Sequence, residues 1–208
     1  MTGMLPLSIA LTLAASVWGI YWLVLRQLET FGLHSAWAVL LLNVIPLPIA
    51  LGLAWRYRRD LRGYLSASVI VGLCLGLGFA FYAVGLVFSS VIRVVLLFYL
   101  MPVWGTLLGI LWLGEPVSAR RWLAVGFGIC GLALMLVPAG GASVPLNIGD
   151  LVALLAGLLW AIGSAYTKRF PTVPLHGTMT VQFIAATAIA LLVALLATGE
   201  QPLPALDA

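Results

Sequence analysis

Long apolar runs without a charged side chain constrain this chain most. A helix that crosses the hydrocarbon core of a bilayer needs about 20 such residues. Seven runs qualify, and none contains Asp, Glu, Lys or Arg: Leu5–Leu25, Ala36–Trp55, Tyr64–Val87, Val94–Leu113, Trp122–Pro138, Leu151–Thr167 and Gly177–Thr198. Only 8% of all residues are charged, against about 25% in soluble domains. We therefore expect an all-α integral membrane protein, built as a multi-helix transmembrane bundle.

The charged residues lie in the connections between these runs, and their distribution is uneven. The connections after the second, fourth and sixth runs hold eight of the ten basic residues: Arg56, Arg58, Arg59, Arg62, Arg120, Arg121, Lys168 and Arg169. The connections on the other side hold Arg26 and Arg93. The positive-inside rule then predicts a cytoplasmic N-terminus, and we expect a multi-pass protein of the plasma membrane, the inner membrane of a bacterium. The basic residues are read as topology signals, so nucleic acid is not an expected partner.

The chain also repeats itself at a constant offset. The segment AASVWGIYWLVLRQL from Ala14 aligns without gaps to AGLLWAIGSAYTKRF from Ala156, which pairs Trp18 with Trp160. Five runs precede the second copy, and an odd number inverts its orientation in the membrane, as in many secondary transporters. We expect a first five-helix repeat over residues 1–138, a connecting loop over 139–149, and the start of a second repeat over 150–208 that holds two helices.

Two segments carry a family resemblance: SVWG at Ser16–Gly19, and FSSVIRVVLLFYLMPVWGTLLGILWLGEPVSARRW at Phe88–Trp122. The second has a Pro within the helix, Pro102, and a Gly-Glu pair at its end. These segments resemble the EamA-like family of the drug/metabolite transporter superfamily. The resemblance implies ten helices in two inverted five-helix repeats, of which about seven are present, so the chain is expected to be truncated at its C-terminus. It also implies that the fourth helix lines a central cavity.

The aromatic candidates for substrate binding are Trp18, Tyr21, Tyr99 and Trp160. Tyr21 lies near the outer end of the first run, where an interfacial aromatic belt is the competing interpretation. Trp18 lies about two turns in from that outer end of the run, and Trp160 is its mate in the repeat. For these two, a cavity wall and plain helix packing both stay open.

The remaining candidates are Arg93 and Pro102. Arg93 either extends to the lipid headgroups or forms a positive lip that attracts an anionic solute group. Pro102 removes one helical hydrogen bond and exposes a carbonyl, which serves either a kink or a cavity. Glu115 is expected to tie its own turn together rather than to handle solute.

Other patterns are read as structural. Cys74 and Cys130 lie within apolar runs and behave as small hydrophobic residues, so no metal and no cofactor are expected. Small residues four apart are expected to let helices approach closely: Gly72 with Gly76, Gly105 with Gly109, and Ala124 with Gly128. No catalytic motif is present, so the chain is not expected to be an enzyme.

These observations predict a secondary transporter that moves a small metabolite or drug-like solute by alternating access. Its partners would be the solute and the lipid bilayer, and a homo-oligomer stays open. The early stop motivates one alternative, a truncated, non-transporting membrane scaffold or relic of such a transporter.

Overall fold

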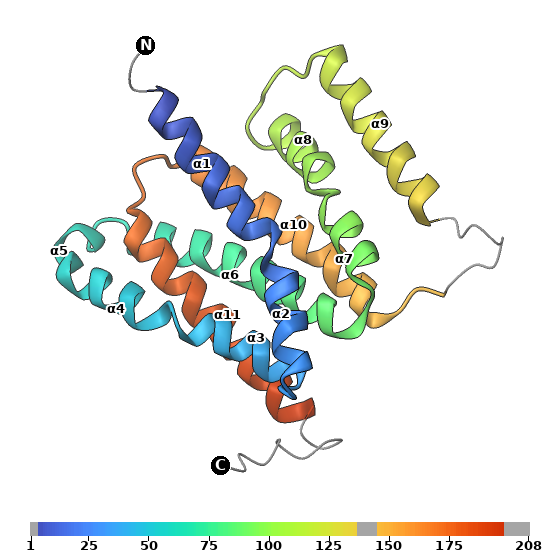
Figure 1. Cartoon of the computed structure of the whole chain (residues 1–208). Coiled ribbons are helices and arrows are strands. Elements are labelled where there is room, and N and C mark those ends of the chain that lie inside the picture. The colour runs from blue at the N-terminus through green and yellow to red at the C-terminus, as the bar shows by residue number, and fades with distance from the viewer. Residues whose placement is uncertain (1–3, 137–144, 198–208) are drawn as a thin grey trace, which may run out of the picture.

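The computed structural model describes residues 4–136 and 145–197, and within these two ranges every regular element is an α-helix. The helices are α1 (Met4–Gly19), α2 (Tyr21–Thr30), α3 (Ser35–Val44), α4 (Leu47–Arg56), α5 (Arg58–Leu61), α6 (Leu65–Phe88), α7 (Val91–Phe98), α8 (Met101–Leu111), α9 (Ala119–Leu136), α10 (Ile148–Arg169) and α11 (Leu175–Ala197) (Figure 1). The all-α fold expected from the apolar runs is confirmed.

Five helical segments of the described chain are long and apolar enough to cross a membrane: Ser35–Arg56, Leu65–Phe88, Val91–Leu111, Ile148–Arg169 and Leu175–Ala197. They correspond to the second, third, fourth, sixth and seventh expected runs. The first expected run is not one continuous helix, because a turn at Ile20 separates α1 from α2. The fifth lies in α9, with Pro138 outside the described residues.

Two of the spans are interrupted near proline. The second span breaks between α3 and α4 ahead of Leu47, where Pro46 precedes the new helix. The fourth breaks at Tyr99 and Leu100, and α8 begins with Pro102 in its first turn. Proline has no N–H to donate and its ring collides with the preceding turn, but its fixed φ suits the start of a helix. Each interruption therefore follows from the local sequence.

Helix α6 forms the centre of the bundle, and it packs against α10 and α11 (Figure 1). Glycine permits both contacts. A Cβ atom at Gly76 would lie 2.5 Å from the Gln182 carbonyl oxygen of α11, and one at Gly78 would lie 3.1 Å from the Trp160 nitrogen of α10. The first distance leaves no room for a side chain and the second is tighter than an ordinary contact, so the backbones of these helices approach closely, as small residues allow in membranes.

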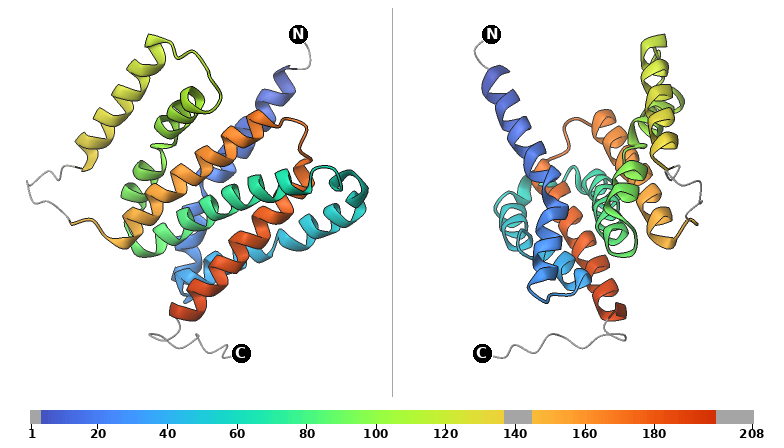
Figure 2. Two further views of the ribbon diagram at one scale, coloured as in Figure 1. Left: turned by 180° about the vertical axis from the view of Figure 1, so that it is seen from behind. Right: turned by 45° about the vertical axis from the view of Figure 1, so that its right-hand side comes forward.

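The other predicted small-residue pairs behave differently. Nothing lies within 4 Å of a Cβ atom built at Gly105 or Gly128, and at Gly109 the nearest atom is a Glu115 carboxylate oxygen, 3.3 Å away. Close helix contact at these positions was expected and is wrong within the described structure. Helix α9 lies at the edge of the bundle and α1 on the opposite flank, with α6, α10 and α11 between them (Figure 2). Helix α9 contacts α7, but no atom lies within 4 Å of a Cβ atom built at its glycines Gly126, Gly128 and Gly131.

The charged connections gather at two ends of the bundle. At one end, Glu115 pairs with Lys168, and the Tyr57 ring lies 5.3 Å from that of His176. These two contacts bring together the turns after α4, α8 and α10. We call this the basic end, because it carries the eight basic residues of those turns. At the opposite end, Arg93 pairs with Asp150 and Arg26 donates to the Leu86 carbonyl over 3.5 Å.

Gly76→Ala should lower the free energy of unfolding by about 1–3 kcal/mol, because the added methyl group collides with the α11 backbone. The measurement is denaturant unfolding in detergent micelles, followed by circular dichroism. Gly128→Ala is the matched control. It gains helix propensity of at most about 1 kcal/mol and meets no atom within 4 Å, so its stability should stay level or rise. Equal destabilisation by both variants would contradict the packing described.

Candidate functional site

The interruption between α7 and α8 places a polar backbone group against α10. Pro102 cannot donate a hydrogen bond to the Phe98 carbonyl four residues earlier. That carbonyl oxygen would lie 2.7 Å from a Cβ atom at Gly157 of α10, so only glycine fits there. The proline thus exposes a carbonyl, and the glycine lets α10 approach it.

Aromatic side chains surround this point. The Phe98 ring lies 4.9 Å from the ring of Tyr82 and 6.0 Å from that of Trp160, the latter edge to face. Tyr99, the next residue, is 5.9 Å from Phe98 ring to ring and is 57% exposed. Two of the predicted site residues, Tyr99 and Trp160, therefore flank the same phenylalanine, one on the surface and one half-buried.

Tyr21 packs against the buried cluster that contains Tyr82 and Phe98. It begins α2, and its ring meets Phe79 of α6 edge to face at 5.4 Å. Tyr21 and Trp160 both pack against the small buried cluster of Phe79, Ala80 and Ala186. Trp18 belongs to α1, but its side chain lies outside the described part of the structure.

A pocket of about 250 Å³ lies between α8 and α10, towards the basic end. Its lining comes from α8, from the α8–α9 connection with the start of α9, and from α10: Met101, Pro102, Gly105, Leu113, Glu115, Arg121, Ala161, Ser164, Ala165 and Lys168. Pro102 is the predicted site residue within it, and Trp160 directly precedes its first α10 residue. An apolar wall with a few converging polar groups is typical of small-molecule sites. We call this the α8–α10 pocket.

Charged groups meet at the basic end of the α8–α10 pocket. The Glu115 carboxylate accepts from the Lys168 ammonium and lies 3.6 Å from an Arg121 guanidinium nitrogen. Arg121 Nε donates over 3.0 Å to the Thr106 hydroxyl, which donates over 2.7 Å to the Pro102 carbonyl. The hydrogen bond from Lys168 and the charges of Lys168 and Arg121 outweigh desolvation and lower the pKa of Glu115.

A second polar cluster closes the opposite end. Arg93 Nη2 lies 2.5 Å from Asp150 Oδ2, and Ser89 Oγ donates to Asp150 Oδ1 over 2.7 Å. The Asp150 side chain is 2% exposed and that of Arg93 16%. Asn147 and Asp150 also form a capping box, in which each side chain accepts from the other's backbone N–H. Arg93 is thus neither a free lip nor a headgroup contact here: the anion it binds is Asp150.

Helix α10 is therefore held at both ends by charge. Asp150 lies in its first turn and Lys168 in its last. Eighteen residues of α-helix span about 27 Å, close to the roughly 30 Å thickness of a bilayer's hydrocarbon core. The two ion-pair clusters accordingly lie near the two membrane surfaces, with the aromatic group and the α8–α10 pocket between them.

Sequence reasoning missed Asp150 and the partner of Glu115. Asp150 lies one residue before the sixth expected run. Only carboxylates within the runs are expected to lie inside the membrane, so Asp150 was not a candidate. The spacing of Asn147 and Asp150, an N-cap residue followed three positions later by an acid, was an available signal. Nothing in the sequence pairs Glu115 with Lys168, 53 positions away. Among the described residues no group of His, Cys, Asp and Glu could hold a metal ion.

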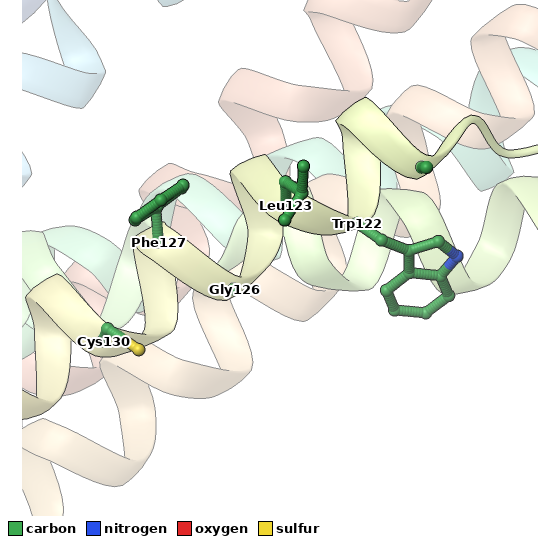
Figure 3. A pocket seen from close by; sticks show the side chains of 6 residues that line it. Trp122, Leu123, Gly126, Phe127 and Cys130 are labelled. Atoms are coloured by element: carbon green, nitrogen blue, oxygen red, sulfur yellow. The ribbon is translucent and has the colours of Figure 1, made fainter.

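A larger hollow, about 600 Å³, lies along the outer face of α9 (Figure 3). Trp122, Leu123, Gly126, Phe127 and Cys130 line it together with Ala119, and all six belong to α9. Phe127 is 76% exposed. An apolar surface of a single helix suits contact with lipid tails, and it offers no converging polar groups. The α8–α10 pocket is the better candidate site.

Comparison with known proteins agrees with this architecture. Residues 6–137 match the family model of the EamA-like transporter family. The chain is also similar to a protein of Bacillus subtilis (strain 168) named uncharacterized transporter YoaV, at 23% identity over an alignment of 163 residues that covers 73% of this chain and 53% of the relative. The chain thus spans about half the length of that relative. No solved structure matches it significantly.

Asp150→Asn should lower the free energy of unfolding by about 3 kcal/mol, because it leaves the Arg93 guanidinium buried without a counter-charge. Glu29→Gln is the control. It removes the carboxylate from the Arg26 pair, in which the arginine side chain is 42% exposed, and it should lose less than about 1 kcal/mol. Unfolding in detergent measures both. Equal losses would show that burial of the Arg93 pair carries no extra stability.

The Glu115 pair should make stability depend on pH. Because the folded pKa of Glu115 lies below its ordinary value of 4.5, the stabilisation is complete above that value and is lost as pH falls through the folded pKa. The free energy of unfolding of the wild type minus that of Glu115→Gln should thus be constant from pH 7 to about 5.5 and shrink at lower pH. Lys168→Met should abolish most of this pH dependence. A difference that grows on acidification would refute the assignment.

Proposed function

Because this chain belongs to the EamA-like transporter family, we propose that it forms a secondary transporter of a small metabolite or drug-like solute. The name of its Bacillus subtilis relative, a transporter, supports the same class. The observation that carries the proposal is α10 itself, which borders the α8–α10 pocket and is tied to the preceding helices by an ion pair at each membrane surface.

The proposed solute path follows the seam between α10 and the interrupted α7–α8 span. Tyr99, Pro102 and Trp160 lie along it, with the Phe98 carbonyl as a polar point in an apolar surrounding. Interrupted helices supply such backbone groups at the solute sites of many carriers. Tyr21, which packs against the same buried clusters as Trp160, would border the path. Trp18 and Arg93 also belong to the proposed site. The solute should present a mainly apolar body.

The two ion-pair clusters suit alternating access. Arg93–Asp150 joins α10 to α7, whereas Glu115–Lys168 joins it to the α8–α9 connection. Access from one side requires α10 to separate from the helix pair at that end while the opposite cluster holds. Such rocking of one repeat against the other is the usual mode in carriers with inverted repeats. The division into repeats over 1–138 and 150–208 belongs to this proposal.

The orientation is also proposed. The basic end would face the cytoplasm and the Arg93–Asp150 end the outside of a bacterial inner membrane, with the N-terminus cytoplasmic. Support comes from the basic turns at one end of the bundle, since positive charge is retained on the cytoplasmic side.

Thiol labelling from the two faces tests alternating access without knowledge of the solute. Ser164 lines the α8–α10 pocket, is exposed, and lies one turn before Lys168. In a chain with Cys74→Ala, Cys130→Ala and Ser164→Cys, an impermeant maleimide should label the new thiol from the basic end. Adding Asp150→Asn weakens the opposite cluster, so labelling from the Arg93 face should rise while labelling from the basic end falls.

Glu29→Gln in the same background is the control, because its ion pair with Arg26 does not involve α10. It should leave both labelling rates unchanged. A static scaffold would show no reciprocal change on Asp150→Asn, and general loosening would raise labelling from both faces. Either result would contradict alternating access.

A further inference from the structure

The turn between α4 and α6 holds positive charge that no ion pair within the described structure neutralises. Arg56, Arg58, Arg59 and Arg62 lie there with a single acid, Asp60. Each of the other charged connections has a basic residue within 4 Å of a carboxylate oxygen: Arg26, Arg93, Arg121 and Lys168. Arg120 and Arg169 have no such partner among the described residues, but each follows or precedes a paired residue directly. An anion from outside the protein is thus the natural counter-charge for this turn.

The same turn forms a pocket of about 400 Å³ lined by Trp55, Arg56, Tyr57, Arg58, Arg59 and Asp60. The Arg58 guanidinium lies over the Trp55 ring at 5.3 Å, and that of Arg56 over Tyr57 at 5.4 Å. A cation–π contact holds each guanidinium over its ring, and its N–H groups can still bind an oxyanion in fork geometry. Two of the arginines are therefore pre-positioned for a phosphate group.

The pocket is attached firmly to the bundle. The Tyr57 ring rests against His176 at the start of α11. Leu61 of α5 contacts Gly177, where a Cβ atom would collide with the leucine side chain. Since both contacts reach the first turn of α11, the wall of the pocket has a fixed position relative to the transmembrane helices.

The position of the pocket along the membrane normal indicates which kind of anion it would meet. Helix α4 completes the span Ser35–Arg56, so the pocket begins where the apolar segment ends. Trp55 is 71% exposed and Tyr64 40%, as expected of aromatic residues at a membrane–water boundary. The arginines therefore lie at the level of lipid headgroups, where phosphodiester groups are concentrated.

We propose that this pocket binds the phosphate of an anionic phospholipid whose headgroup carries hydroxyl groups, such as phosphatidylglycerol. Arg56 and Arg58 bind the phosphate oxygens, and the acyl chains extend along the exposed apolar side of α4. Asp60 lines the same pocket and accepts a hydrogen bond from a headgroup hydroxyl. Clusters of basic residues next to a transmembrane helix attract anionic lipids strongly. The site is independent of any solute path.

Native mass spectrometry of the full chain tests this. The protein is released from micelles that hold equal amounts of phosphatidylglycerol and phosphatidylcholine, and the retained lipid is counted. The wild type should retain phosphatidylglycerol preferentially, and Arg56→Gln with Arg58→Gln should reduce that preference about tenfold. The matched control is Arg120→Gln with Arg169→Gln, which removes two exposed charges at the same end outside the pocket. It should keep the preference.

Arg56→Lys with Arg58→Lys guards against a folding defect, because it keeps the charge and loses the guanidinium fork held over each ring. It should retain an intermediate preference. Equal losses in the pocket variant and the control would mean a diffuse surface charge and overturn the proposal. So would displacement of the lipid by about 10 mM inorganic phosphate, a concentration well below the ionic strength that screens exposed charges, since the pocket would then be a free-anion site.

Discussion

Direct backbone contact between α6 and its two neighbours is the interaction on which the rest of the structure depends. In a bilayer, apolar side chains gain little by leaving lipid for protein, so close packing must hold helices together. Gly76 against α11 and Gly78 against α10 supply it. Once α10 lies at that distance, Gly157 meets the Phe98 carbonyl, Trp160 reaches Phe98, and Asp150 reaches Arg93. The positions of the glycines therefore determine the arrangement of the site.

The sequence predicts the fold well where the bilayer dictates it. Apolar length locates the spans, and the basic bias groups the turns now seen at one end. It fails where packing decides. Gly76 and Gly128 lie in similar small-residue patterns, but one touches a helix and the other touches nothing. The turn at Ile20 is not predicted by a proline in the neighbouring sequence. The mutual positions of Arg93 and Asp150, 57 residues apart, depend on a three-dimensional contact that no local spacing encodes.

The candidate site shows the same division. Tyr99, Pro102 and Trp160 could be selected from residue type and depth, and the structure places all three along one seam. The ion pairs at the two ends of this seam could not be predicted in the same way. Their residues lie in connections between the apolar runs, where charge is interpreted as a topology signal. Arg93 was recognised as unusual, yet its significance changes once a buried carboxylate is found beside it. A charge near a membrane surface can be read only together with its counter-charge.

The interrupted span also bears on mechanics. Helix α10 is one uninterrupted rod of 22 residues, whereas its neighbour is jointed at Tyr99 and Leu100 into segments of 8 and 11 residues. A continuous helix resists bending more than an interrupted one, so the interrupted α7–α8 span deforms first. When the helices move relative to one another, α10 is therefore expected to move as a rigid body. The bending is expected at the interruption between α7 and α8. The most compliant point of the pair is then the one that bears Tyr99 and exposes the Phe98 carbonyl.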